Sequence, residues 1–149
     1  MSSRHGIHRY LTLVTVVLAL VSGPLIIEAA PTTAQSWGKQ IYHKGTSPTG
    51  GDITAIVGSE GVTLLASAVP CASCHGTDGL GRPEGGVLPP DIRWSELIKG
   101  YGHVHEDGRK HPAFDENSLA RLIRTGLDPA SNRLDESMPL YNMSVEDMD

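Results

Sequence analysis

Apolar residues recur at helical spacing in three short segments of this chain. These are residues 36–45, 91–99 and 119–125. We expect Ser36 to cap the first helix and either Asn117 or Ser118 to cap the third, because their side chains can accept hydrogen bonds from backbone amides. A glycine stands at or directly after the end of each segment, which is typical of helix C-termini. The pattern therefore predicts several short helices.

The remaining chain is rich in turns and loops. Residues 53–57 and 62–69 are apolar enough to form short strands, although the same runs would fit buried loop segments. Residues 76–90 hold many glycines and prolines, which favours an irregular loop. There is no internal repeat. The prediction is an all-α fold, in which short helices are joined by long loops.

The N-terminus has the order of segments that marks a secretory signal peptide. A basic start precedes an apolar run over residues 11–27, and small residues follow that run. A Gly-Pro break within the run weakens it as a permanent membrane span. We expect cleavage after Ala34, which gives a signal peptide over residues 1–34 and a single mature domain over residues 35–149. An uncleaved anchor in the inner membrane is the alternative.

The chain carries a formal charge of −5. Loss of the signal segment, which holds Arg4, Arg9 and Glu28, would leave it one unit more acidic. An acidic surface disfavours nucleic acid and anionic membrane surfaces as partners. Aromatic residues are scarce, with one Phe, two Trp and four Tyr, so side chains alone would form a thin core.

The chain has two cysteines, in the sequence Cys71-Ala72-Ser73-Cys74-His75. Export would allow a disulfide, but this spacing with an adjacent histidine indicates c-type haem attachment. Two thiols separated by two residues can bond to the two vinyl groups of one porphyrin, and His75 then lies beneath the iron as its proximal ligand. A redox-active Cys-x-x-Cys normally opens a helix in a thioredoxin-like setting, and structural zinc takes four ligands. The sequence offers neither.

The residues around this motif resemble those of class I cytochromes c. Residues 76–81 continue the motif as in that family. Pro90 matches the proline whose carbonyl accepts a hydrogen bond from the proximal histidine, and Met138-Pro139 matches the loop that supplies the sixth ligand. The resemblance implies a small cytochrome c-like fold around one covalently bound haem c, with His75 and Met138 as axial ligands of the iron.

The chain departs from that family at two places. An unusually long segment separates the first predicted helix from Cys71. Residues 144–147 have the pattern of a helix start, yet the sequence stops at Asp149, so we expect the C-terminal helix to be truncated. Residues 38–141 also resemble, more loosely, cytochrome modules fused before a periplasmic ligand-binding domain. That resemblance implies an electron-transfer module of a larger periplasmic protein.

Other side chains could occupy the sixth position on the iron. Met143 and Met148 lie near Met138 in sequence but are not followed by a stiffening proline. Bis-histidine ligation is a further alternative. Its candidate residues are His43, His103, His105 and His111. The choice matters, because a Met–His pair raises the reduction potential and suits electron transfer, whereas an open site would allow peroxide or gas chemistry.

The loop that contains His103, His105 and His111 also holds carboxylates, so a copper or zinc site is conceivable there. A solvated polar loop is the favoured interpretation, because a ligand count alone is weak support for a metal. The haem propionates would need hydrogen-bond donors as well. The candidate donors are Arg82, Arg93, Trp94, Arg109 and Lys110.

Together these features predict a periplasmic electron carrier that cycles one electron on its haem iron and is not itself an enzyme. Its partner would be a redox protein such as a periplasmic dehydrogenase or a terminal oxidase. Membrane contact is expected only if the N-terminal segment is retained. The alternative is a haem enzyme, or a gas- or peroxide-binding sensor, with an open or histidine distal site.

Overall fold

The structure is a computed structural model that describes residues 30, 32–83, 85–105 and 107–148. The chain divides into two units, Met1–Ala30 and Pro31–Asp149, and every described helix and strand lies in the second. Apart from its last few residues, the predicted signal peptide lies outside the described residues. Within the described part of the chain, no helix is long and apolar enough to cross a membrane.

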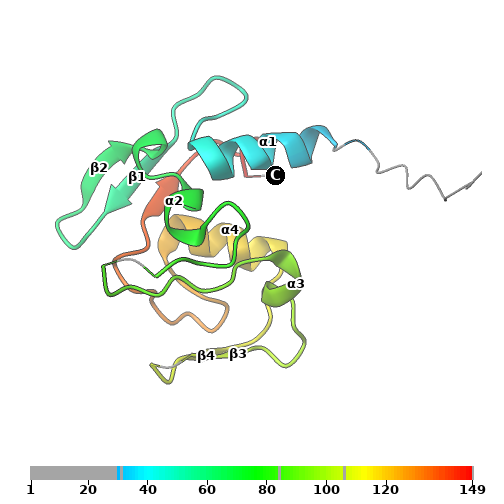
Figure 1. The fold of residues 1–149 in the computed structure, drawn as a ribbon, viewed down its shortest axis with the longest axis vertical. Coiled ribbons are helices and arrows are strands. Elements are labelled where there is room, and N and C mark those ends of the chain that lie inside the picture. Colours follow the sequence, from blue (N-terminus) through cyan, green and yellow to red (C-terminus); the bar gives the residue numbers. More distant parts are fainter. Residues whose placement is uncertain (1–29, 31, 84, 106, 149) are drawn as a thin grey trace, which may run out of the picture. The chain divides into compact units, whose positions relative to one another are not determined.

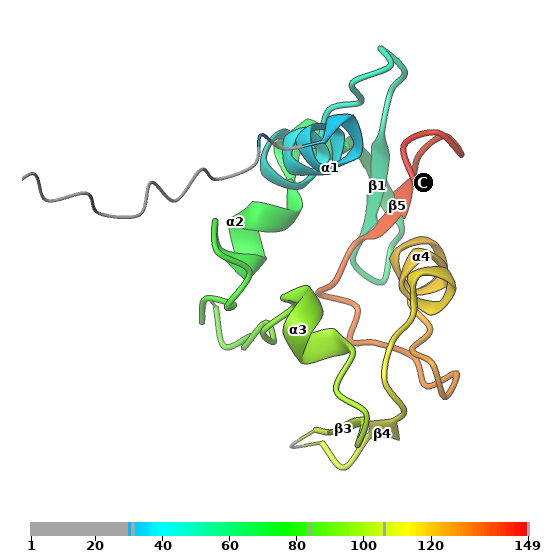
Figure 2. The ribbon, with the colours of Figure 1, turned by 90° about the vertical axis from the view of Figure 1, so that its right-hand side faces the viewer.

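The described residues of the second unit form ten short elements (Figure 1). In chain order they are α1 (Thr33–Lys44), β1 (Thr54–Val57), β2 (Val62–Leu65), the 3₁₀ turn η1 (Ala66–Ala68), α2 (Cys71–His75), α3 (Trp94–Leu97), β3 (His103–Val104), β4 (Lys110–His111), α4 (Glu116–Thr125) and β5 (Leu140–Asn142). β5, near the end of the chain, lies beside β1 in both Figure 1 and Figure 2. The β3–β4 hairpin lies at the opposite end of the unit from α1.

The first helix begins earlier than predicted, because its cap is Thr32 and not Ser36. The Thr32 side chain accepts a hydrogen bond from the Gln35 amide at 3.2 Å, and the Gln35 side chain accepts one from the Thr32 amide at 2.9 Å. This reciprocal pair is a capping box, which satisfies two otherwise unpaired amides. α1 ends at Gly45 in a left-handed conformation, which confirms the predicted stop.

The predicted all-α fold is wrong. In the described residues the helices are accompanied by five strands in two antiparallel sheets, so the fold is mixed. β1 is the central strand of a sheet with the order β2-β1-β5. On one side Ala55 pairs with Leu64, and on the other side it pairs with Tyr141. β3 and β4 form the second sheet, in which His103 pairs with His111.

The reason for the error is that the strands are very short and one of their pairings is non-local. β1 and β2 span four residues each and are closed by a tight turn, in which the Gly61 amide donates to the Gly58 carbonyl at 3.1 Å. Their sequences allowed a strand but did not require one. The pairing of β5 with β1 joins segments that are far apart along the chain, and no local periodicity reports such a contact.

The other two predicted helices have different limits from those expected. Asp91 accepts a hydrogen bond from the Arg93 amide at 3.0 Å, and this local turn keeps the chain out of helix until Trp94. α3 is therefore only four residues long. α4 is capped by Asp115, whose side chain accepts from the Ser118 amide at 2.7 Å, so Ser118 lies inside the helix.

The core is thin, in line with the scarcity of aromatic residues. Besides Pro139, the buried apolar side chains among the described residues are Ile53, Ala55, Ala66, Leu97, Phe114 and Tyr141. All except Leu97 and Phe114 form one cluster, supplied by β1, η1, β5 and the residue before β1. The apolar face of α4, which carries Leu119, Leu122 and Ile123, is only half-buried.

Candidate haem-binding site

The sequence Cys71–His75 forms a single short helix, α2 (Figure 1). Pro70 precedes it in an extended conformation, and its carbonyl accepts a hydrogen bond from the Ser73 amide at 2.9 Å. Side chains three positions apart on a helix lie on the same face, so Cys71 and Cys74 point to the same side. Cys71 is half-buried, Cys74 is exposed, and both thiols are free. α2 therefore presents two unpaired thiols within one turn.

The environment of Cys71 does not suit a redox-active thiol. Burial raises the pKa of Cys71, and the neighbouring Cys74 acts in the same direction. The nucleophilic cysteine of a redox-active Cys-x-x-Cys normally has a lowered pKa, which makes it a thiolate near neutral pH. Cys71 shows the opposite shift, and this disfavours the disulfide-exchange interpretation of the motif.

His75 is buried, with 6% of its surface exposed. Its Nδ1 lies 3.3 Å from the carbonyl oxygen of Pro90, which is the contact expected from the sequence. Because a carbonyl can only accept, Nδ1 carries the proton and Nε2 keeps its lone pair. Burial lowers the pKa of His75, although the bond to Pro90 opposes this shift, so the imidazole is neutral at neutral pH. A neutral imidazole with a free Nε2 is the form that binds a metal ion.

The loop after α2 folds back to bring Pro90 against His75. The Gly81 amide donates to the His75 carbonyl at 2.9 Å, and the Ile92 amide donates to the Gly79 carbonyl at 2.8 Å. Gly81 has a φ of +83°, and a Cβ at this position would collide with the carbonyl oxygen of Pro89. The close approach of Gly81 to the residue before Pro90 is therefore part of how the proline carbonyl is positioned.

We expect Gly81→Ala to destabilise the protein by about 2–3 kcal/mol, because the added Cβ meets backbone atoms and alanine is strained at positive φ. Urea unfolding measures this loss. Gly100→Ala is the matched control, since no atom lies within 4 Å of a Cβ at that turn position. The control should change the free energy of unfolding by less than about 0.5 kcal/mol. Equal losses in the two variants would contradict the proposed close packing at Gly81.

Met138 lies at the end of a hydrogen-bonded loop. Its amide donates to the Asp135 carbonyl at 3.1 Å, and the Asp135 side chain accepts from the Ser137 amide at 2.9 Å. Pro139 follows and is buried, and β5 then begins at Leu140. The half-buried Met138 side chain packs against the same core cluster as Cys71. The structure thus brings the segment that holds Met138 and the start of α2 to one core.

The alternative ligands have other surroundings. Met143 follows β5 directly and packs against the same core, while Met148 is half-buried in the last described turn. Neither methionine is followed by a proline. His43 lies on α1 and makes an edge-on contact with the ring of Tyr42, with the ring centroids 5.1 Å apart.

Two of the candidate propionate donors are already paired with aspartates: these are Arg93 and Arg109. Arg82 and Lys110 form no ion pair within the described residues. The Arg82 side chain lies against Gly76, the residue directly after the proximal histidine candidate. Among these four cations, Arg82 is therefore the one that combines a free charge with a place beside α2.

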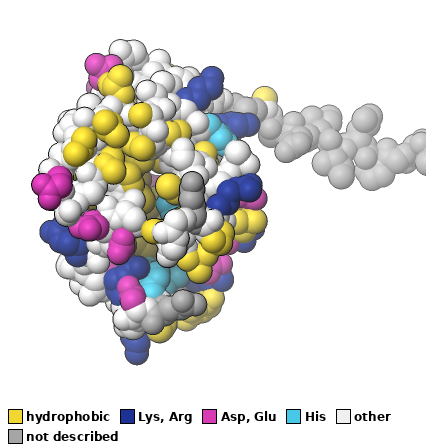
Figure 3. Space-filling view, turned by 60° about the vertical axis from the view of Figure 1, so that its left-hand side comes forward, with side chains coloured by type: hydrophobic (Ala, Val, Ile, Leu, Met, Phe, Trp, Pro, Cys, Tyr) yellow, Lys and Arg dark blue, Asp and Glu magenta, His cyan; other side chains and the backbone are white. Residues whose placement is uncertain are grey.

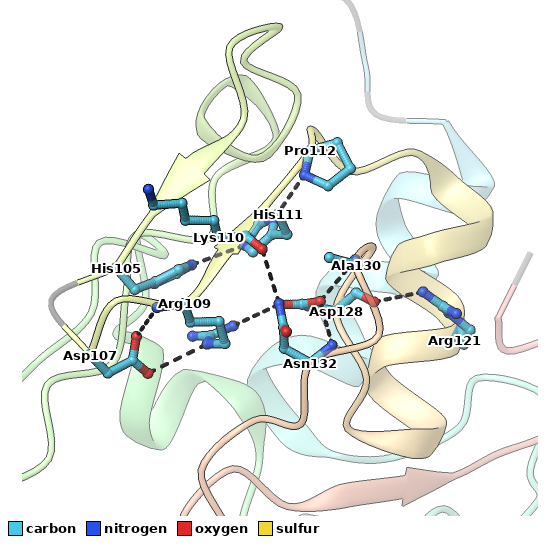
Figure 4. Close-up of polar contacts among 10 residues, drawn as sticks. All are labelled: His105, Asp107, Arg109, Lys110, His111, Pro112, Arg121, Asp128, Ala130 and Asn132. Carbon is cyan, nitrogen blue, oxygen red and sulfur yellow. Dashed lines mark hydrogen bonds and ion pairs between the residues drawn. The ribbon is translucent and has the colours of Figure 1, made fainter.

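A buried carboxylate, Asp128, organises the loop between α4 and Met138 (Figure 4). It is fully buried and accepts hydrogen bonds from the Ala130 and Asn132 amides, both at 2.9 Å. The Asn132 side chain donates at 3.0 Å and the Arg109 guanidinium at 3.3 Å. The Arg121 side chain donates to the Asp128 carbonyl at 2.6 Å. Sequence reasoning missed this residue, although Asp-Pro followed by Ser and Asn is a recognisable turn signal.

The three histidines of the predicted polar loop lie together on the β3–β4 hairpin. The ring centroid of His111 is 4.9 Å from that of His103 and 5.1 Å from that of His105. His111 Nδ1 donates to the Pro112 carbonyl at 2.7 Å, so its Nε2 accepts from His105 Nε2 at 2.9 Å (Figure 4). Across the described residues, no group of three or more His, Cys, Asp and Glu side chains is placed to hold a metal ion.

We expect the half-buried His105 side chain to make the stability of the hairpin depend on pH. Burial lowers the pKa of His105, with Arg109 and His111 adding to the shift and Asp107 opposing it. A lowered folded-state pKa means that stability is fully present above the ordinary value of about 6.5 and is lost as the pH falls below it. We expect the urea concentration at the unfolding midpoint to decrease as the pH falls below about 6.5. His105→Gln should make this pH dependence weaker. Equal slopes in the two proteins would contradict this assignment.

Compared with protein-family models, with curated proteins and with solved structures, the chain gives no match in any of the three. The proposals for its function therefore rest on its residues and their geometry.

Proposed function

We propose that the mature chain is a periplasmic electron carrier with one covalently bound haem c, ligated by His75 and Met138. The observation that carries this proposal is the arrangement at α2. Two free thiols lie on one face of a single helix, and the next residue is a buried imidazole whose Nδ1 faces the Pro90 carbonyl. The spaced thiols suit thioether attachment, and the oriented imidazole suits axial ligation of a metal.

The residues at α2 fit a porphyrin in chemical terms. Each thiol would add across one vinyl group, with sulfur bonding to one carbon of the vinyl group and hydrogen to the other. His75 Nε2 keeps its lone pair because Nδ1 carries the proton, and the bond to Pro90 orients the ring. A bound haem would supply a one-electron couple between ferrous and ferric iron.

The exposed apolar surface also fits a bound porphyrin. Large apolar side chains remain exposed after α2 and around α3, where Leu88 is 65% exposed and Trp94 and Ile98 are each 44% exposed. Figure 3 shows apolar side chains gathered in patches on one face of the molecule. Surface patches of this kind usually mark ligand or partner sites. A flat apolar macrocycle would add the buried area that the thin core lacks.

Met138 suits the sixth position because its backbone is held on both sides. The Asp135 turn precedes it, and the buried Pro139 and β5 follow it. A fixed thioether keeps the iron six-coordinate, excludes small ligands and raises the reduction potential. These properties belong to an electron carrier and not to a peroxide- or gas-binding protein. The partner would be a periplasmic redox protein such as a dehydrogenase or a terminal oxidase, and the acidic chain favours a basic docking region on it.

The experiment is to produce the chain in a bacterial periplasm together with cytochrome c maturation proteins. We expect one haem per chain that stays attached under denaturing conditions. The oxidised protein should show the weak near-infrared absorption of methionine–iron ligation, and the reduced protein should not bind carbon monoxide. Chain produced without maturation proteins is the control. Absence of covalent haem would overturn the proposal, and rapid carbon monoxide binding would replace it with the sensor or enzyme alternative.

A further inference from the structure

The long segment between α1 and α2 has a specific place in the fold. It forms the β1–β2 hairpin, and the free side of β1 pairs with β5. β5 begins at Leu140, so only Pro139 separates it from Met138. Figures 1 and 2 both show β5 running beside β1. The hairpin therefore contacts the strand that continues directly from the candidate sixth ligand.

The side chain of Tyr141 joins the same strand to the start of α2. Tyr141 is 6% exposed and lies opposite Ala55, which is fully buried. Its hydroxyl donates a 2.6 Å hydrogen bond to the carbonyl of Val69, a residue 72 positions away in the chain. Val69 precedes Cys71 by two residues. One hydroxyl thus connects the strand after Met138 with the segment that leads into the two thiols.

The two contacts constrain different directions. Pairing with β1 fixes the register of β5, because a slip by one residue would turn Tyr141 out of the core and Leu140 into it. The Tyr141–Val69 bond fixes the separation between β5 and the residues before α2. Burial raises the pKa of Tyr141, so the hydroxyl remains a donor at all ordinary pH values.

We propose that the β1–β2 hairpin and Tyr141 form a clamp that holds Met138 at a fixed position relative to Cys71–His75, with Tyr141 as a positioning residue for the sixth ligand. This inference rests on the proposed function, since it assumes a haem attached at α2. With haem attached, the clamp would keep the Met138 thioether on the iron and would oppose its replacement by other ligands. In its absence, the backbone hydrogen bonds that hold Met138 among the described residues are those of the Asp135 turn.

The test compares two tyrosine variants of the haem-loaded protein. Tyr141→Phe removes the hydroxyl bond on the Met138 side. Tyr42→Phe is the matched control, because the Tyr42 hydroxyl also donates a 2.6 Å bond to a backbone carbonyl, that of Gly76 beside His75. Imidazole is titrated into the ferric protein while the methionine–iron absorption is recorded. We expect Tyr141→Phe to bind imidazole about three- to tenfold more tightly than wild type, and Tyr42→Phe to stay within about twofold.

A general loss of stability would give a different pattern. Urea unfolding should show similar losses in the two variants, because each loses one bond of the same length. Equal gains in imidazole affinity in both variants, or no gain in Tyr141→Phe, would overturn the clamp. Ala55→Gly provides a second variant that weakens β1 opposite Tyr141, and it should also raise the imidazole affinity. If wild type lacks covalent haem or methionine absorption, the proposed function itself fails, and this is seen before any variant is made.

Discussion

Replacement of Met138 by alanine should lower the reduction potential of the haem-loaded protein by on the order of 0.1 V and open the reduced iron to carbon monoxide. In the proposed haem protein, the Met138 thioether would stabilise ferrous iron and fill the sixth position, and alanine has no atom that can do either. The Asp135 turn and β5 are unaffected by the change, so the loop keeps its course. Redox titration gives the potential, and absorption spectra with carbon monoxide report the open position.

Met143→Ala is the matched control for this prediction. Met143 packs against the same core cluster as Met138 but follows β5 instead of preceding it. The control should cost some stability, because it removes a half-buried side chain, while the potential and the closed sixth position stay as in wild type. If Met143→Ala opens the iron and Met138→Ala does not, Met143 is the ligand and the assignment is wrong.

Asp128→Asn should destabilise the protein by about 2–4 kcal/mol. The carboxylate accepts from two backbone amides, from Asn132 and from the Arg109 guanidinium, and it is fully buried. An amide in its place turns one acceptor into a donor and leaves Arg109 without its buried counter-charge. Urea unfolding is the measurement. Asp135→Asn serves as the control, because Asp135 is exposed and its side chain accepts a single backbone bond. It should cost about 1 kcal/mol or less.

Asp128 should also make the free energy of unfolding depend on pH under acidic conditions. Burial alone would raise its pKa, but the hydrogen bonds from Asn132, and then that from Arg109, outweigh burial and lower the pKa. A folded-state pKa below the unfolded value of about 3.9 stabilises the fold above that pH, and the contribution is lost as the pH falls further. Asp128→Asn should lack this part of the acid dependence. A variant that keeps the full wild-type slope would contradict the assignment.

Local sequence signals predicted the parts of the fold that depend on local contacts. Gly45 and Gly126 end α1 and α4 as expected, because a left-handed cap is encoded by one residue. The predicted N-terminal caps of these helices were wrong. Thr32 and Asp115 lie close to serines that could also cap a helix, and the residue that caps is the one whose partner completes the capping box. The sheet was missed because Ala55 and Tyr141 are far apart in the sequence and pair only after the chain has folded.

The candidate site also contains residues that local sequence signals could predict and residues that they could not. The thiols and His75 could be named from their spacing, and the contact between His75 and Pro90 followed from a family resemblance. Asp128 and Tyr141 could not be found in this way. Their roles come from burial and from partners distant in the sequence, Arg109 for the carboxylate and Val69 for the hydroxyl. Single-sequence patterns carry no such information.

The β1–β5 pairing has a consequence for the order in which the molecule is assembled. β1 and β2 are joined by a turn of four residues, so they can pair early, as soon as both have been synthesised. β5 must close a loop that contains α2, α3 and α4, so its pairing is slow and comes late. In the proposed haem protein, the two thiols would therefore remain accessible to the maturation machinery while the strand after Met138 is still unpaired. Covalent attachment would precede closure, and a chain whose β5 pairs too early would be the poorer substrate.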